Sequence, residues 1–119
     1  MTKTDRQIKG GFGEALVESY LAEQGIRVIG RNVRLGRWEI DLLAEHQNTL
    51  LVIEVRMRSS EWIHPLETLT PKKLQAVRRA AQRLLQTYRF RASYVRFDVA
   101  AVTKVAGIFH VDYRAGAFE

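Results

Sequence analysis

RWEIDLLAEHQNTLLVIEVRMR, residues 37–58, has the pattern of a β-hairpin that carries acidic side chains on otherwise apolar strands. Two runs rich in leucine and β-branched residues flank the polar residues 46–49. Any loop of even length at the centre of this polar segment sets Asp41 opposite Glu54. The segment therefore predicts two carboxylates side by side on neighbouring strands.

Side chains alternate between the two faces of a strand, so this hairpin is predicted to have one apolar and one charged face. The apolar face comprises Ile40, Leu42, Ala44, Leu51, Ile53, Val55 and Met57. The charged face comprises Glu39, Asp41, Glu54, Arg56 and Arg58, with Glu39 opposite Arg56. Like charges directly opposite each other are destabilising, so Asp41 and Glu54 need a compensating cation or solvation. A divalent metal ion is the economical candidate.

Length and composition favour one globular domain that spans residues 1–119, because 119 residues with 46% apolar content suffice for one core only. The absence of cysteine excludes disulfides and thiolate metal sites. Residues 1–11 contain no apolar run for a signal peptide or a membrane span, so we expect a cytoplasmic protein.

The charge balance favours polyanionic partners such as nucleic acid. Nineteen basic residues against thirteen acidic residues give a net charge of +6 and a pI near 10.1. Fourteen of the basic residues are arginine, which suits bidentate contacts to phosphate. A biased base composition of the gene would produce the same excess of arginine. The sequence leaves both explanations open.

Periodicity predicts the remaining elements. The expected helices cover residues 12–24, ending at Gly25, and residues 70–88, with Thr70 as N-cap and Pro71 at the first helical position. Further strands are expected at residues 26–33, 94–102 and 108–113, a frayed end at residues 1–9, a flexible glycine lead at residues 10–13, and a surface loop at residues 59–69. The order α, β, β, β, α, β, β predicts an α/β fold with a mixed sheet flanked by helices.

Several side chains have both a functional and an ordinary interpretation. Glu14 lies at the edge of an apolar helical stripe, where it is either a solvated carboxylate or a partner of the hairpin acids. Trp62 and His64 are either ordinary loop residues or a stacking ring and a base. The basic residues Arg31, Arg34, Arg37, Lys72, Lys73, Arg78, Arg79 and Arg83 either contact phosphates or form solvated faces.

Five segments in order carry a family resemblance: GGFGEALVESYLAEQGIRVIGRNVR, EIDLLAE, LLVIEVRMRSS, TPKKLQAVRRAAQRLL and VRFDV. They resemble the YraN family, also described as UPF0102, whose members are similar to archaeal Holliday junction resolvases. The resemblance covers roughly residues 10–104. It implies a restriction-endonuclease-like domain with an αβββαβ core and a nuclease site of the PD-(D/E)xK type.

By position, the resemblance makes Asp41 and Glu54 the metal-binding carboxylates and Glu14 the additional helix acid. Arg56 occupies the place of the motif lysine. Mg²⁺ or Mn²⁺ would polarise the phosphodiester and activate water, with the Val55 carbonyl as a candidate third ligand. The alternative is an ordinary ionic face in which Glu39 pairs with Arg56 and Asp41 with a nearby arginine.

Two departures from the family pattern concern activity. Trp38 stands where the family has glycine, and Arg56 cannot act as a base because arginine stays protonated. We therefore expect weak or no cleavage, increased by Arg56→Lys.

The function expected is divalent-metal-dependent endonuclease activity on DNA, with branched DNA as a candidate substrate. A catalytically silent DNA-binding module is the alternative, and a basic scaffold for an acidic protein or an anionic membrane surface is a third. Resolvases of this fold act as symmetric dimers, so the resemblance also implies a homodimer and no membrane partner.

Overall fold

The computed structural model describes residues 5–35, 38–58, 70–88 and 92–117. Its elements are α1 (Asp5–Glu23), β1 (Arg27–Leu35), β2 (Trp38–His46), β3 (Thr49–Arg58), α2 (Pro71–Tyr88), β4 (Tyr94–Val105) and β5 (Ile108–Arg114). The predicted order of two helices and five strands is confirmed, and the fold is mixed α/β.

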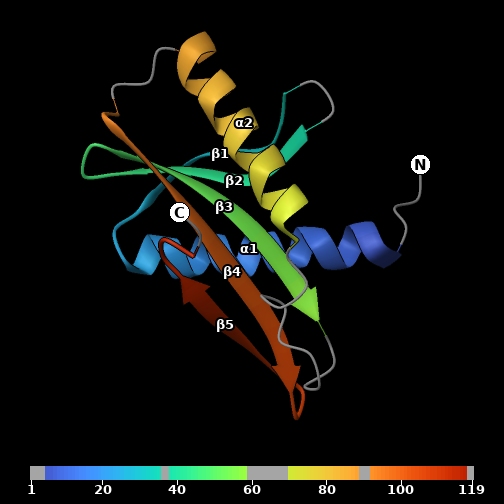
Figure 1. Cartoon of the computed structure of the whole chain (residues 1–119). Helices are drawn as coiled ribbons and strands as arrows, with labels where there is room; N and C mark the ends of the chain where they lie inside the picture. Colours follow the sequence, from blue (N-terminus) through green and yellow to red (C-terminus); the bar gives the residue numbers. More distant parts are fainter. Residues whose placement is uncertain (1–4, 36–37, 59–69, 89–91, 118–119) are drawn as a thin grey trace.

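The strands form one sheet in the order β1-β2-β3-β4-β5. Neighbouring strands are antiparallel except β3 and β4, which run parallel because α2 forms the crossover between them. The two helices lie on opposite faces of the sheet, with α2 over β1 and β2 and α1 across the other face (Figure 1). The mixed sheet flanked by helices is therefore confirmed.

The central hairpin has the predicted register as far as the pair Leu42–Ile53, but the expected pairs Asp41–Glu54 and Glu39–Arg56 are not part of the ladder. Gln47 and Asn48 both have positive φ, 48° and 63°, as the two central residues of a type I′ turn require. The β2–β3 pairs run from His46–Thr49 to Leu42–Ile53. The assumption of an even-length loop is thus correct.

Helix α1 ends as predicted but begins earlier than predicted. Gly25 has φ 75°, and the Ile26 N–H donates to the Leu21 carbonyl at 2.9 Å, as in a Schellman motif. The helix starts at Asp5, so the glycines expected to form a flexible lead are helical. A Cβ at Gly13 would lie 3.4 Å from the Met57 sulfur. Close packing against β3 at Gly13 thus helps to offset the cost of glycine in a helix, about 1 kcal/mol per residue.

Both faces of the central hairpin are buried, which corrects the prediction of a single apolar face. One core cluster, on the α1 side, contains Val17, Leu21, Leu42, Ala44, Leu51, Ile53, Ala100 and Val102. The other, on the α2 side, contains Ile40, Leu43, Leu50, Val52, Val77, Ala80, Ala81 and Leu84. The crossover helix covers the second face, so that face is also apolar.

Ile40 lies on the α2 side, whereas it was predicted to share a face with Leu42. Strict alternation would place both residues on one face. The strand therefore departs from regular alternation at Asp41, between them.

No helix in the described part of the chain combines the length and the apolar character needed to cross a membrane.

Candidate functional site

The first two strands share an irregularity at Asn32 and Asp41. Asn32 lies inside β1 with φ 49°, in the left-handed region. The flanking pairs are Arg31–Leu42 and Val33–Ile40. Val33 packs on the α2 side, while Arg31 forms an ion pair with Glu18 of α1. The two strands thus change face together.

Asp41 lies at the point where the pairing of β2 with β3 ends, and a backbone hydrogen bond fixes its side chain. Its Oδ2 accepts a hydrogen bond of 2.8 Å from the backbone N–H of Val55. That N–H belongs to the peptide group that joins Glu54 to Val55. The carboxylate of Asp41 consequently lies at the backbone of the second predicted acid, just beyond the last assigned pair of the β2–β3 ladder, Leu42–Ile53.

Glu14 reaches this region from α1 and is 9% exposed. Asn32 Nδ2 donates a hydrogen bond of 3.2 Å to its Oε2. Burial and the negative charge of Asp41 raise the pKa of Glu14 above its usual 4.5, with a smaller contribution from Glu39. The Asn32 hydrogen bond and the Arg31 charge lower that pKa, but the net direction is upward.

Glu54 and Arg56 form a pair along β3. Ile53 and Val55 both pack on the α1 side, so Glu54 and Arg56 alternate to the other face. Glu54 is 7% exposed, and its Oε1 lies 3.5 Å from Arg56 Nε. The Nε atom is buried and, among the described residues, has no hydrogen-bond partner.

The alternative pairing of Glu39 with Arg56 is wrong. Glu39 lies 3.6 Å from Arg34 on the adjacent strand, and Arg56 turns to Glu54. The reason is the position of Glu39 in the β1–β2 ladder, where Arg34 is its direct neighbour.

The donor set suits a hydrated hard cation better than an enclosed one. Within the described ranges, no group of three or more His, Cys, Asp or Glu side chains is arranged to hold a metal. Mg²⁺ takes one or two protein carboxylates and keeps several waters. The carboxylates of Glu14 and Asp41 meet that requirement, and the charge of Asp41 disfavours the charged form of Glu14 until a cation is present.

The predicted nucleic-acid contacts fall on separate surfaces. Arg31 and Arg34 lie on β1 in the ion pairs described above, and both are exposed. The basic residues of α2 lie on the opposite side of the sheet from α1: Lys72 and Arg79 are exposed, Arg78 is half-buried, and Lys73 belongs to the same helix. A hollow on α2 is lined by Arg79, Gln82, Arg83 and Gln86.

Some predicted residues cannot be placed in this site. Arg37, Trp62 and His64 lie outside the described residues. Trp38 is the first residue of β2.

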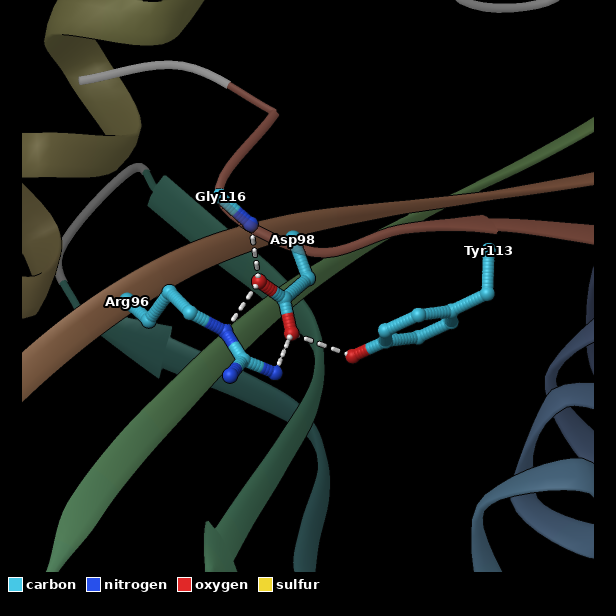
Figure 2. Close-up of polar contacts among 4 residues, drawn as sticks. All are labelled: Arg96, Asp98, Tyr113 and Gly116. Carbon is cyan, nitrogen blue, oxygen red and sulfur yellow. Dashed lines mark hydrogen bonds and ion pairs between the residues drawn. The ribbon is translucent and has the colours of Figure 1, made fainter. Parts of the chain in front are cut away.

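The sequence interpretation missed two features. The first is Asn32, whose only signal is the residue type, since asparagine tolerates positive φ better than most residues. The second is a network around Asp98 of β4, which is 0% exposed (Figure 2). Its signal was an aspartate two residues after an arginine in a largely apolar strand.

The Asp98 carboxylate accepts hydrogen bonds from Arg96, Tyr113 and the Gly116 backbone N–H. Arg96 binds both oxygens, at 2.8 and 2.9 Å, and the Gly116 nitrogen lies 2.8 Å away. Burial and the bond to Asp98 raise the pKa of Tyr113 far above its usual range. This network joins β4 to β5 and to the turn that follows β5.

Comparison with known proteins places the sequence among bacterial relatives. A family model described as "Uncharacterised protein family UPF0102" matches residues 13–102. A UPF0102 protein of Chlorobium phaeobacteroides is 35% identical, covering 98% of this chain and 97% of its own length. One from Beutenbergia cavernae is 38% identical over 90% of this chain and 92% of its own. One from Chlorobium limicola is 45% identical over 78% of this chain and 73% of its own.

Proposed function

This chain belongs to the uncharacterised protein family UPF0102, and we propose that it is a DNA-binding, divalent-metal-dependent nuclease of restriction-endonuclease-like fold. Branched DNA is the candidate substrate. The observation that carries the proposal is the convergence of two acids. Asn32, on the strand next to β2, binds Glu14 of α1, and the negative charge of Asp41 on β2 raises the pKa of Glu14. Two acids held together from separate elements favour a cation between them.

The proposed chemistry is phosphodiester hydrolysis. A bound Mg²⁺ or Mn²⁺ would polarise the phosphate and lower the pKa of a water. Glu14 and Asp41 would hold the ion, with the Val55 carbonyl on the adjacent strand as a further candidate ligand. Glu54, expected from the sequence to be a second ligand, alternates to the other face of β3 and pairs there with Arg56. Arg56, in the place of the motif lysine, would stabilise negative charge on the phosphate through its permanent positive charge.

The charge of α2 supports nucleic acid as the partner. Residues 71–88 contain five basic side chains and no acidic one. Arg79 and Arg83 are four residues apart, a spacing at which like charges repel on a helix. The phosphate groups of a nucleic-acid backbone on this surface would relieve the repulsion. Such contacts would not depend on the base sequence.

A charge-reversal experiment tests this surface. Arg78→Glu with Arg79→Glu should weaken binding to all DNA sequences alike, and the slope of log affinity against log salt should become shallower by about 2. Lys104→Glu with Arg114→Glu, on β4 and β5, makes the same change in net charge and should leave the slope near that of the wild type. Equal slopes for all three proteins would exclude α2 as the binding surface.

A catalytically silent DNA-binding module is the second candidate, and the Glu54–Arg56 pair favours it. Arg56 carries a permanent positive charge 3.5 Å from the Glu54 carboxylate. That charge competes with a metal ion for Glu54. Weak cleavage by the wild-type protein is therefore expected even if Glu14 and Asp41 bind metal.

Cleavage assays separate the two candidates. Branched and linear DNA are incubated with wild type, Arg56→Lys and Asp41→Asn, with and without Mg²⁺ or Mn²⁺. The nuclease proposal predicts metal-dependent cleavage that rises in Arg56→Lys and disappears in Asp41→Asn. DNA binding without cleavage by any variant would support the silent module. Efficient wild-type cleavage that falls in Arg56→Lys would show that arginine is a competent member of the site.

Assembly and location are part of the proposal. We propose a cytoplasmic homodimer, as the likeness to dimeric resolvases implies. Sedimentation of the protein with and without branched DNA tests this assembly.

A further inference from the structure

Asn32 adopts a backbone conformation that its place in the fold does not require. Besides Asn32, the described non-glycine residues with positive φ are Gln47, Asn48 and Ala106. All three lie in the two-residue connections of hairpins, where positive φ is needed. Asn32 instead lies within β1, in the left-handed region at φ 49°. Strained conformations inside regular elements are concentrated at functional sites.

The conformation of Asn32 has a local consequence at the acidic centre. Its side chain reaches α1, and its Nδ2 donates to Glu14 Oε2 at 3.2 Å. In a regular strand Arg31 and Asn32 would point to opposite faces. Here Arg31 pairs with Glu18 and Asn32 with Glu14, both on α1. The left-handed residue thus allows two successive side chains to contact the same helix.

We infer that Asn32 is a positioning residue that holds the Glu14 carboxylate beside Asp41, ready for a divalent cation. This inference rests on the proposed function. Two negative charges on β2, those of Asp41 and Glu39, act on Glu14 and raise its pKa. The positive charge of Arg31 on β1 acts in the opposite direction. A neutral amide donor fixes one carboxylate oxygen without adding a positive charge that would compete with the metal. A hydrogen-bond partner that orients a metal-binding carboxylate typically contributes a factor of 10 to 100 to metal affinity.

Position 32 requires a residue that tolerates positive φ and that carries a neutral side-chain amide donor, and few residues other than asparagine meet both requirements. Glycine adopts positive φ without strain but has no side-chain amide. Aspartate tolerates the same backbone region but adds a third negative charge beside Glu14 and Asp41. Asn32→Gly and Asn32→Asp therefore separate the backbone requirement from the hydrogen bond.

Asn48 offers a matched control. It also has positive φ, 63°, and its Nδ2 donates to Ser93 Oγ at 2.9 Å. Asn48→Gly removes an amide from a left-handed residue in the hairpin turn, away from the acidic centre. The change in urea midpoint of Asn48→Gly therefore measures how much the loss of such an asparagine changes stability when no acidic centre is involved.

The first measurement is Mn²⁺ affinity, with folding followed in urea. Asn32→Gly should weaken Mn²⁺ binding by roughly 10- to 100-fold, while Asn48→Gly binds as the wild type does. The urea midpoint of Asn32→Gly should not fall below that of Asn48→Gly, because glycine relieves the strain. Unchanged Mn²⁺ affinity in Asn32→Gly would overturn the inference.

The second measurement needs no metal and keeps the inference distinct from the proposed function. The side-chain amide resonances of Asn32 should shift in Glu14→Gln, whereas those of Asn48 should not. If wild type binds no Mn²⁺ but these resonances shift, the proposed function fails and the contact of Asn32 with Glu14 is supported. If they do not shift, the positioning role is refuted whatever the metal result.

Discussion

Two buried acids in this protein, Asp98 and Glu14, have opposite surroundings. Asp98 accepts hydrogen bonds from two side chains and one backbone N–H, and one of those side chains is the cation Arg96. Glu14 accepts one bond from a neutral amide and lies near the negative charge of Asp41. The carboxylate of Asp98 is compensated by the fold, while that of Glu14 is not.

The difference separates a structural acid from a candidate ligand. A buried carboxylate is tolerated when its charge is paired and its lone pairs are filled. Asp98 meets both conditions and ties β5 and the turn after it to β4 (Figure 2). Glu14 meets them only in part, so it retains capacity for a cation. Substitutions at the two centres should therefore have different consequences.

The largest effect on stability is expected from Asp98→Ala. It leaves the Tyr113 hydroxyl, the Gly116 N–H and the Arg96 guanidinium without their acceptor, and each partly buried donor left unsatisfied costs about 1–3 kcal/mol of unfolding free energy. Asp112→Ala is the matched control, because Asp112 pairs with Arg114 at the same spacing but is exposed. It should cost less than about 1 kcal/mol. Urea denaturation that gives similar losses for both would remove the distinction between compensated and exposed acids.

A smaller effect is expected from Tyr113→Phe. The hydroxyl bonds a charged group, and loss of such a bond costs about 1.5–3 kcal/mol. The ring remains stacked on Tyr20, with centroids 5.5 Å apart. Tyr20→Phe also keeps that stacking and leaves the bond to Asp98 intact, so its cost should be smaller. Equal thermal stability of Tyr113→Phe and wild type would mean that Asp98 does not need this donor.

The smallest effect on stability, with opposite sign, is expected from Glu14→Gln. The pKa of Glu14 is raised on folding from its usual 4.5, so the folded protein binds more protons than the unfolded chain between 4.5 and the folded pKa. Wild-type stability then falls as pH rises through that window. Without metal, Glu14→Gln should be more stable than wild type at neutral pH, and the advantage should vanish as pH falls below the window. A pH series of urea midpoints that shows the reverse trend would contradict the raised pKa.

The sequence predicted most of the fold because its signals are local. Thr70 and Pro71 mark the start of α2, and the turn at Gln47 and Asn48 sets the register that brings Asp41 to the backbone beside Glu54. These features depend on capping and turn chemistry within a few residues.

The errors arose where distant packing overrides local preference. Helix α1 extends back over its glycines although no local pattern shows it, and one of them, Gly13, packs closely against β3. The shift of Ile40 to the α2 side depends on the paired irregularity at Asn32 and Asp41. The Asp98 network joins β4 to residues 15–18 positions later in the chain, so spacing within the strand could not reveal it.

The most direct test of the central claim is the affinity for Mn²⁺ of wild type, Glu14→Gln, Asp41→Asn and Asp112→Asn. Glu14 and Asp41 are expected to bind the ion together. Glu14→Gln and Asp41→Asn should each weaken Mn²⁺ binding by more than roughly 10- to 100-fold, the loss typical for a residue that only hydrogen-bonds to a metal ligand. Asp112→Asn should bind as wild type does. No binding by wild type, or equal affinity in all four proteins, would contradict the assignment of Glu14 and Asp41 as a cation site.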